Sequence, residues 1–179
     1  MRTAPCWTAR LAGLLAAFAA TAPAAAQTSG ALPGGANSLQ EIFENWTVAC
    51  VQQGAGKRCA LSQQQADQQS HQRVLAIELT APSADRVAGT LVLPFGLALD
   101  SGVTLQVDEA PAGPRLRFRT CLPGGCLVSL SFDAGQAAAL RKGAALKVNA
   151  VADGGKDAVF TISLKGYPAA LDRMTALAK

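Results

Sequence analysis

The chain contains little of what most enzymes and metal sites require. Its 179 residues include one histidine, His71, and aromatic and charged residues make up only 5% and 16% of the sequence. A single histidine excludes most metal centres and most triad-type hydrolases, so we expect no metal and no cofactor. The net charge of +4 includes Arg2 and Arg10 near the N-terminus, and so weak a positive balance excludes a strongly basic nucleic-acid-binding protein.

The N-terminus has the organisation of a cleaved export signal. Two arginines flank the start of the apolar run at 11–20, and the small residues at 24–26 match a signal-peptidase site. A membrane anchor is the competing interpretation, but the run is short and Pro23 interrupts the segment after it. We therefore expect a signal peptide over 1–26, no transmembrane span in the mature chain, and a location in the periplasm, the outer membrane or the extracellular space.

Removal of the signal peptide with Cys6 leaves four cysteines, and an even number in an exported chain indicates disulfides. Three pairings are possible. The short spacings and the turn-forming residues between them favour Cys50–Cys59 and Cys121–Cys126, each across a hairpin tip. A four-cysteine zinc site is disfavoured because the spacings do not match zinc knuckles. A redox-active pair is disfavoured because no Cys-x-x-Cys motif is present.

The rest of the chain is dominated by short aliphatic and β-branched runs separated by glycine, proline, aspartate or asparagine. These runs lie at 46–50, 73–79, 87–93, 103–107, 115–119, 126–132, 146–151 and 158–164. The pattern predicts an all-β fold, an antiparallel β-sandwich or barrel-like sheet of about 8–10 short strands. It forms a single domain over 41–179, after a flexible leader over 27–40 that is rich in glycine, serine and proline.

Two helices are predicted beside the strands. Asp133 and Gln136 have the spacing of a capping box for a short helix near 133–142, which Gly143 ends. A C-terminal helix begins near Pro168, a favoured first-turn residue. Its apolar residues fall at helical spacing, and we expect this stripe to dock on the sheet rather than to bind a partner (Leu171, Met174, Leu177).

Several motifs together resemble the invasion-associated locus B family of bacterial envelope proteins. They are Trp46-x-x-x-Cys50, Cys59-x-Leu61-x-Gln63, Leu93-Pro94-Phe95-Gly96-Leu97-x-Leu99-x-x-Gly102-Val103, Cys121-x-Pro123-x-Gly125-Cys126 and Leu164-x-Gly166-Tyr167-x-x-Ala170-Leu171. The resemblance covers roughly 44–175. It departs at Tyr167, where phenylalanine is expected, and at a Gln-rich loop over 63–72. It implies an exported β-rich domain of a Gram-negative bacterium, associated with host-cell invasion and virulence, and it supplies no catalytic residues.

One charged cluster suggests a binding function. Alternation places Arg115, Arg117 and Arg119 on one face of a strand, with Leu116 and Phe118 on the other. Three guanidinium groups in a row would hold phosphate or sulfate groups of lipopolysaccharide or a host glycan. The sequence alone favours the simpler interpretation, a solvated outer face or edge charges that prevent aggregation of sheets.

Three functions from different classes remain open. The favoured one is an exported, non-enzymatic envelope or surface protein whose partner is a host-cell or envelope component, either a protein or an anionic glycolipid. The second is a periplasmic accessory or chaperone-like binding module without a host role. The third is an unrecognised hydrolase, for which the adjacent Asp108 and Glu109 offer no support, since neighbours on a strand point to opposite faces.

Overall fold

The computed structural model describes residues 31–54, 56–70, 72–83 and 86–179. These residues form ten strands, two α-helices and two short 3-10 helices. In chain order the elements are η1 (Pro33–Gly35), β1 (Ser38–Phe43), β2 (Trp46–Gln53), β3 (Gly56–Ala66), β4 (Arg73–Ser83), β5 (Arg86–Leu93), η2 (Leu99–Ser101), β6 (Thr104–Val107), β7 (Phe118–Leu122), β8 (Gly125–Phe132), α1 (Ala134–Lys142), β9 (Ala145–Val151), β10 (Asp157–Ser163) and α2 (Tyr167–Ala178). The predicted signal peptide and His71 lie outside the described residues.

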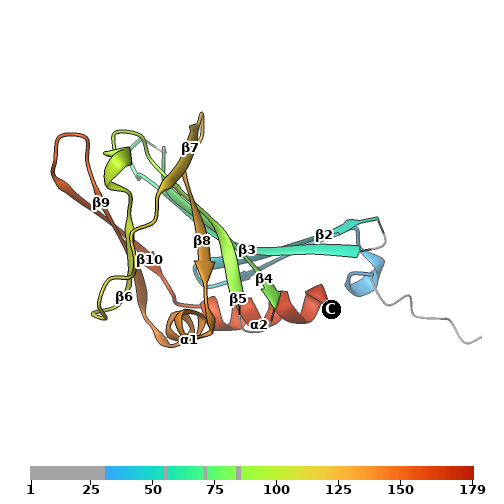
Figure 1. The fold of residues 1–179 in the computed structure, drawn as a ribbon. Helices are drawn as coiled ribbons and strands as arrows, with labels where there is room; N and C mark the ends of the chain where they lie inside the picture. Colours follow the sequence, from blue (N-terminus) through green and yellow to red (C-terminus); the bar gives the residue numbers. More distant parts are fainter. Residues whose placement is uncertain (1–30, 55, 71, 84–85) are drawn as a thin grey trace, which may run out of the picture.

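The strands form two antiparallel sheets. The large sheet has the order β1-β2-β3-β4-β5-β8-β7, and the small sheet has the order β10-β9-β6. Figure 1 shows the small sheet at the left, beside the end of the large sheet that contains β8 and β7. One hydrophobic core joins residues of both sheets and both helices. The predicted antiparallel sandwich is confirmed, and it is open rather than closed into a barrel.

Side chains alternate between core and solvent along the strands, as the period of a β-strand requires. In β2 the buried residues are Trp46, Val48 and Cys50, while Ala49 and Val51 are exposed on the other face. The same alternation in β4, β5 and β8 aligns leucine, isoleucine and valine on one inner face. Aliphatic side chains therefore build most of the core, as the low aromatic content predicted.

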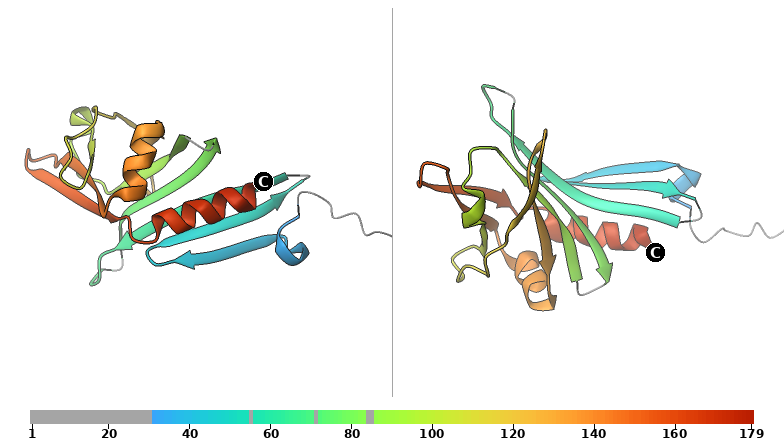
Figure 2. Two further views of the ribbon diagram at one scale, coloured as in Figure 1. Left: turned by 90° about the horizontal axis from the view of Figure 1, so that it is seen from below. Right: turned by 45° about the horizontal axis from the view of Figure 1, so that its top comes forward.

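Both predicted helices are present. The Asp133 carboxylate accepts a hydrogen bond from the N–H of Gln136 at 2.8 Å, and the Gln136 side chain accepts one from the N–H of Asp133 at 3.0 Å, which completes the capping box. The second helix, α2, lies along the large sheet beneath β2 and β3 (Figure 2). Its apolar stripe is buried there, so the predicted docking is confirmed (Tyr167, Ala170, Leu171, Met174, Leu177).

Side chains of β2 and β3 bind the backbone of β10, the edge strand of the small sheet. The indole of Trp46 and the amide of Gln63 both donate hydrogen bonds to the carbonyl oxygen of Ser163, each at 2.9 Å. The amide of Gln65 donates to the carbonyl oxygen of Thr161 at 2.7 Å. We call this set the β3–β10 bridge. It joins the two sheets immediately before α2 begins.

The β3–β10 bridge corrects the prediction of a Gln-rich loop over 63–72. Residues 63–66 continue β3, and Gln63 is the one buried polar residue in the described core, with 6% of its surface exposed. Glutamine has little intrinsic preference for strands. Here its amide satisfies backbone carbonyls of the neighbouring sheet, a long-range reason that the local sequence does not reveal.

The predicted flexible leader over 27–40 is wrong at its C-terminal end. Leu32 is buried, with 2% of its surface exposed, and β1 begins at Ser38. In β1 the residues Leu39 and Phe43 are half-buried and pack against the core, while the backbone pairs with β2. The domain therefore begins before residue 41. The glycine and proline residues that suggested a linker form η1, a single turn that carries Leu32 into the core.

Both predicted disulfides are present. Cys50 lies directly opposite Cys59 in the pairing of β2 with β3, and Cys121 lies opposite Cys126 in the pairing of β7 with β8. The Cα–Cα separations are 4.1 and 3.9 Å. Each disulfide closes a hairpin and limits the conformations of the unfolded chain, which stabilises the fold by about 2–3 kcal/mol for such short loops in the chain-entropy model.

We predict that Tyr167→Phe stabilises the protein. The Tyr167 ring packs edge-on against Trp46, with centroids 5.2 Å apart, and its buried hydroxyl has no hydrogen-bond partner among the described residues. Removing an unsatisfied hydroxyl should raise the free energy of unfolding by about 1 kcal/mol. Denaturant titration measures this. A loss of 1 kcal/mol or more would show that the hydroxyl has a partner.

Alkaline titration provides an independent readout of the same residue. Burial raises the pKa of Tyr167 to about 12. The unfolded chain loses this proton near pH 10, so stability should fall as the pH rises from about 10 to 12, and Tyr167→Phe should lack that fall. Because the chain has one tyrosine, tyrosinate absorbance reports Tyr167 alone.

Candidate anion-binding surface

Arg115 and Arg117 lie on the connection between the two sheets, and Arg119 lies in the strand that follows it. This connection leaves the small sheet after β6 and enters the large sheet at β7, which begins only at Phe118. The predicted strand over 115–119 is therefore corrected. Residues 115–117 are irregular, apart from one bridge between Leu116 and Val103, because proline and glycine residues at 111–114 turn the chain before regular pairing resumes.

The structure nevertheless brings the three arginines together. They line one open hollow of about 450 Å³, with residues of η2 on one side and of β7 on the other. We call it the arginine hollow, and its lining residues are Leu99, Asp100, Arg115, Arg117, Phe118, Arg119 and Thr120. All three arginines are exposed. Sequence analysis identified the arginines but missed the contribution of η2, which depends on contacts between distant segments.

Close packing at Gly102 places η2 beside the arginines. Gly102 has φ +62°, a conformation that favours glycine, and a Cβ atom there would lie 2.4 Å from the carbonyl oxygen of Leu116. On either side of this contact, Val103 and Leu116 exchange two backbone hydrogen bonds, of 2.9 and 2.8 Å. The absence of a side chain at Gly102 thus allows η2 and the arginine segment to meet.

A β-bulge determines the position of Arg119. Phe118 pairs with Val128 and Thr120 pairs with Leu127, so Arg119 is the extra residue of the edge strand β7. The hairpin that carries it is held by the Cys121–Cys126 disulfide and by Arg73, whose guanidinium donates a 2.7 Å hydrogen bond to the carbonyl oxygen of Gly124. The position of Arg119 is therefore fixed by covalent and polar contacts within the large sheet.

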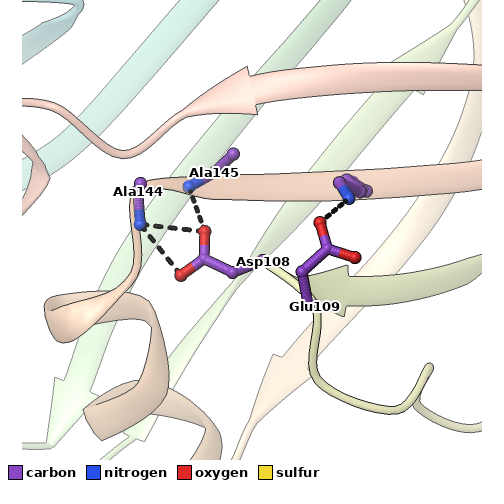
Figure 3. A network of polar contacts seen from close by, with 5 residues as sticks. Asp108, Glu109, Ala144 and Ala145 are labelled. Carbon is purple, nitrogen blue, oxygen red and sulfur yellow. Dashed lines mark hydrogen bonds and ion pairs between the residues drawn. The ribbon is translucent and has the colours of Figure 1, made fainter.

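Asp108 fixes the other end of the connection (Figure 3). Its carboxylate accepts hydrogen bonds from the backbone N–H groups of Ala144 and Ala145, the shortest at 2.8 Å. Asp108 has φ +49°, which turns the chain out of β6. Glu109 points elsewhere and pairs with Lys147 at 2.6 Å. The two carboxylates thus have separate structural roles. The prediction assumed that they lie on a strand, whereas both lie in the turn that follows β6.

The arginine hollow is positively charged. Among the described residues, none of its three guanidinium groups belongs to an ion pair, and Asp100 is the single acidic side chain in its lining. Clustered like charges repel one another and do not stabilise a fold. Planar guanidinium groups bind phosphate, sulfate and carboxylate oxygens through paired hydrogen bonds. The arrangement is suited to binding an anionic group.

Two further hollows lie near α1. One, of about 180 Å³, is enclosed by α1, β6 and the proline-containing segment, and its lining has no ionisable side chain. The other, between α1 and α2, contains the ion pair of Arg141 with Asp172. Neither of these hollows nor the arginine hollow contains two carboxylates. None of the described helices has the length and apolarity needed to cross a membrane.

Comparisons with known proteins agree with this architecture. Residues 46–175 match the model of the family described as invasion associated locus B (IalB) protein. The chain belongs to the invasion-associated locus B family. The matched range includes all four disulfide cysteines and the three arginines, and it confirms the resemblance found in the sequence.

Individual relatives of the IalB family cover nearly the whole chain. An invasion protein B homologue of Brucella abortus is 45% identical over 171 residues, which cover 95% of this chain and 98% of the relative. Invasion protein B of Bartonella bacilliformis is 36% identical over 170 residues, which cover 92% of this chain and 90% of the relative. The crystal structure of invasion associated protein B from Bartonella henselae superposes with a TM-score of 0.73 at 34% identity, covering 78% of this chain and 96% of that one.

We predict that Asp108→Ala lowers the free energy of unfolding by about 2 kcal/mol, because two backbone N–H groups lose their acceptor. Asp108→Asn should cost less, since asparagine tolerates positive φ and keeps one acceptor oxygen. Glu109→Ala is the matched control. Its ion pair is exposed, so the change should stay below about 0.5 kcal/mol. Denaturant titration that finds equal effects for Asp108→Ala and Glu109→Ala would contradict the anchoring role of Asp108.

Proposed function

We propose that this protein is an exported, non-enzymatic envelope or surface protein that binds an anionic group of a host-cell or envelope component through the arginine hollow. The observation that carries the proposal is the gathering of three exposed guanidinium groups, unpaired among the described residues, in one hollow where the connection between the sheets enters β7. The names of the IalB relatives support a role at the host cell.

Export is supported by two independent features. The first 26 residues have the charge and apolar pattern of a signal peptide. The four cysteines of the predicted mature chain form two disulfides, which persist in oxidising compartments such as the periplasm and the extracellular space. We therefore assign the protein to the periplasm, the outer membrane or the extracellular space.

A binding role is favoured over catalysis by what the hollows contain. Acid–base catalysis needs a positioned acid and base within reach of one substrate. The apolar hollow under α1 offers no ionisable group, and the arginine hollow offers one carboxylate beside three permanent cations. Arginine remains charged at physiological pH, which suits it to binding anions and not to proton transfer.

We predict that replacing Arg115, Arg117 and Arg119 together by glutamine weakens binding to heparin and to lipopolysaccharide at least about tenfold. One charge-assisted hydrogen bond to an anion contributes about 1.5–3 kcal/mol, and the variant loses several of them. Binding of the unmodified protein should weaken with increasing salt. Salt-dependent elution from immobilised heparin and titration with lipopolysaccharide measure both effects.

The control for this experiment removes three charges elsewhere. Arg58, Lys142 and Lys179 are exposed and lie outside the arginine hollow, so their joint replacement by glutamine changes net charge equally. Equal loss in both variants would show that binding depends on net charge alone. Unchanged binding in the arginine variant, accompanied by aggregation, would show that the three arginines protect the edge of the sheet instead.

A further inference from the structure

Exposed apolar side chains lie on the segments next to the arginine hollow. Among the residues that the structure describes, six large hydrophobic side chains are strongly exposed, and three of them lie on segments next to the hollow. These three, which we call the apolar rim, are Phe95 at 61%, Leu99 at 46% and Leu122 at 52% exposed. Isolated exposed apolar residues are common on proteins. Here they lie on segments next to three arginines that form no ion pair within the described part of the chain, which is a specific combination.

Strand register places the rim at one end of the molecule. Leu93, Cys126 and Cys121 lie in one row across β5, β8 and β7. The segment that carries Phe95 and the turn that follows Leu122 therefore leave the large sheet at the same end of its strands. In Figure 1 this end is at the top, where the β7–β8 hairpin and the lime-green turn of η2 lie. Leu99 itself lines the arginine hollow.

The rim is held rigidly in its exposed position. Phe95 lies between Leu93 and Leu97, which are both buried, and Leu97 forms a bridge with Ala152 of the β9 end. The N–H of Asp153 donates a 2.9 Å hydrogen bond to the carbonyl oxygen of Gly96. The disulfide of the β7–β8 hairpin holds Leu122. Ordering these segments on binding therefore costs little conformational entropy.

We propose that this end of the molecule docks on the surface of an anionic phospholipid bilayer. The arginines bind lipid phosphates, and the apolar rim enters the boundary between headgroups and acyl chains. Apolar side chains next to cationic ones are the combination that binds such interfaces. The rim side chains protrude from turns and a hairpin, a shape that suits a soft lipid surface. This inference rests on the anion binding proposed above.

The decisive experiment compares two matched triple variants of the mature protein. One changes the rim, Phe95→Ser, Leu99→Ser and Leu122→Ser. The control changes the other three exposed apolar residues, Ile42→Ser, Val51→Ser and Val159→Ser. Co-sedimentation uses vesicles of phosphatidylcholine mixed with phosphatidylglycerol, and vesicles of phosphatidylcholine alone. We expect binding to the mixed vesicles only, about tenfold weaker for the rim variant and unchanged for the control.

Heparin binding separates failure of this inference from failure of the proposed function. The double variant Phe95→Ser and Leu122→Ser changes no residue of the hollow's lining. It should keep its affinity for heparin, which has no acyl chains. Vesicle binding that is absent, or equal in the rim and control variants, would overturn membrane docking. If heparin binding then persists and still depends on the arginines, the proposed function stands. Loss of arginine dependence in both assays would overturn both.

A single-site measurement guards against unfolding of the triple variants. Leu122→Trp adds a fluorophore at the rim, and Val159→Trp adds one on the edge strand β10 of the small sheet. Both variants share the emission of the buried Trp46, which the unmodified mature protein measures alone. Mixed vesicles should shift the emission of the rim tryptophan to shorter wavelength and leave that of the control unchanged. Equal emission shifts at both positions, or no shift at either, would contradict docking through the rim.

Discussion

The fold depends on the β3–β10 bridge, in which Trp46, Gln63 and Gln65 donate hydrogen bonds to backbone carbonyls of the small sheet. Buried polar groups stabilise a structure only when they are satisfied, and here the donors of the large sheet meet the acceptors of the edge strand β10. The bridge fixes how the two sheets meet. These hydrogen bonds form only when the donors face those carbonyl oxygens, so they specify one arrangement of the two sheets. Apolar packing alone would specify that arrangement less strictly.

The arginine hollow depends on this arrangement. Arg119 belongs to β7 of the large sheet, whereas Arg115 lies on the connection that comes from β6 of the small sheet. The hollow therefore exists only when the two sheets are correctly joined. The two anchors of the connection, Asp108 at one end and the Cys121–Cys126 disulfide at the other, lie outside the hollow. Rigid positioning of charged side chains by a scaffold is what distinguishes a built binding surface from scattered surface charge.

Much of the fold could be predicted from local sequence patterns. Alternation identified most strands, the spacing of Asp133 and Gln136 identified α1, and short spacing identified both disulfides. The errors have a common cause. The end of the predicted leader belongs to β1, the start of the predicted glutamine-rich loop belongs to β3, and residues 115–117 of the predicted arginine strand are irregular. In each case distant partners decide the conformation. For the site, the sequence revealed the three arginines but not η2 or the apolar rim.

Amide hydrogen exchange with and without a heparin oligosaccharide tests the central claim most directly, since it locates the binding surface on the unmodified protein. The account predicts added protection in the two segments that form the hollow, 97–103 and 115–122, and none in α2 or in the β2–β3 hairpin. Protection confined to the outer face of the large sheet, or spread evenly over all basic residues, would contradict it.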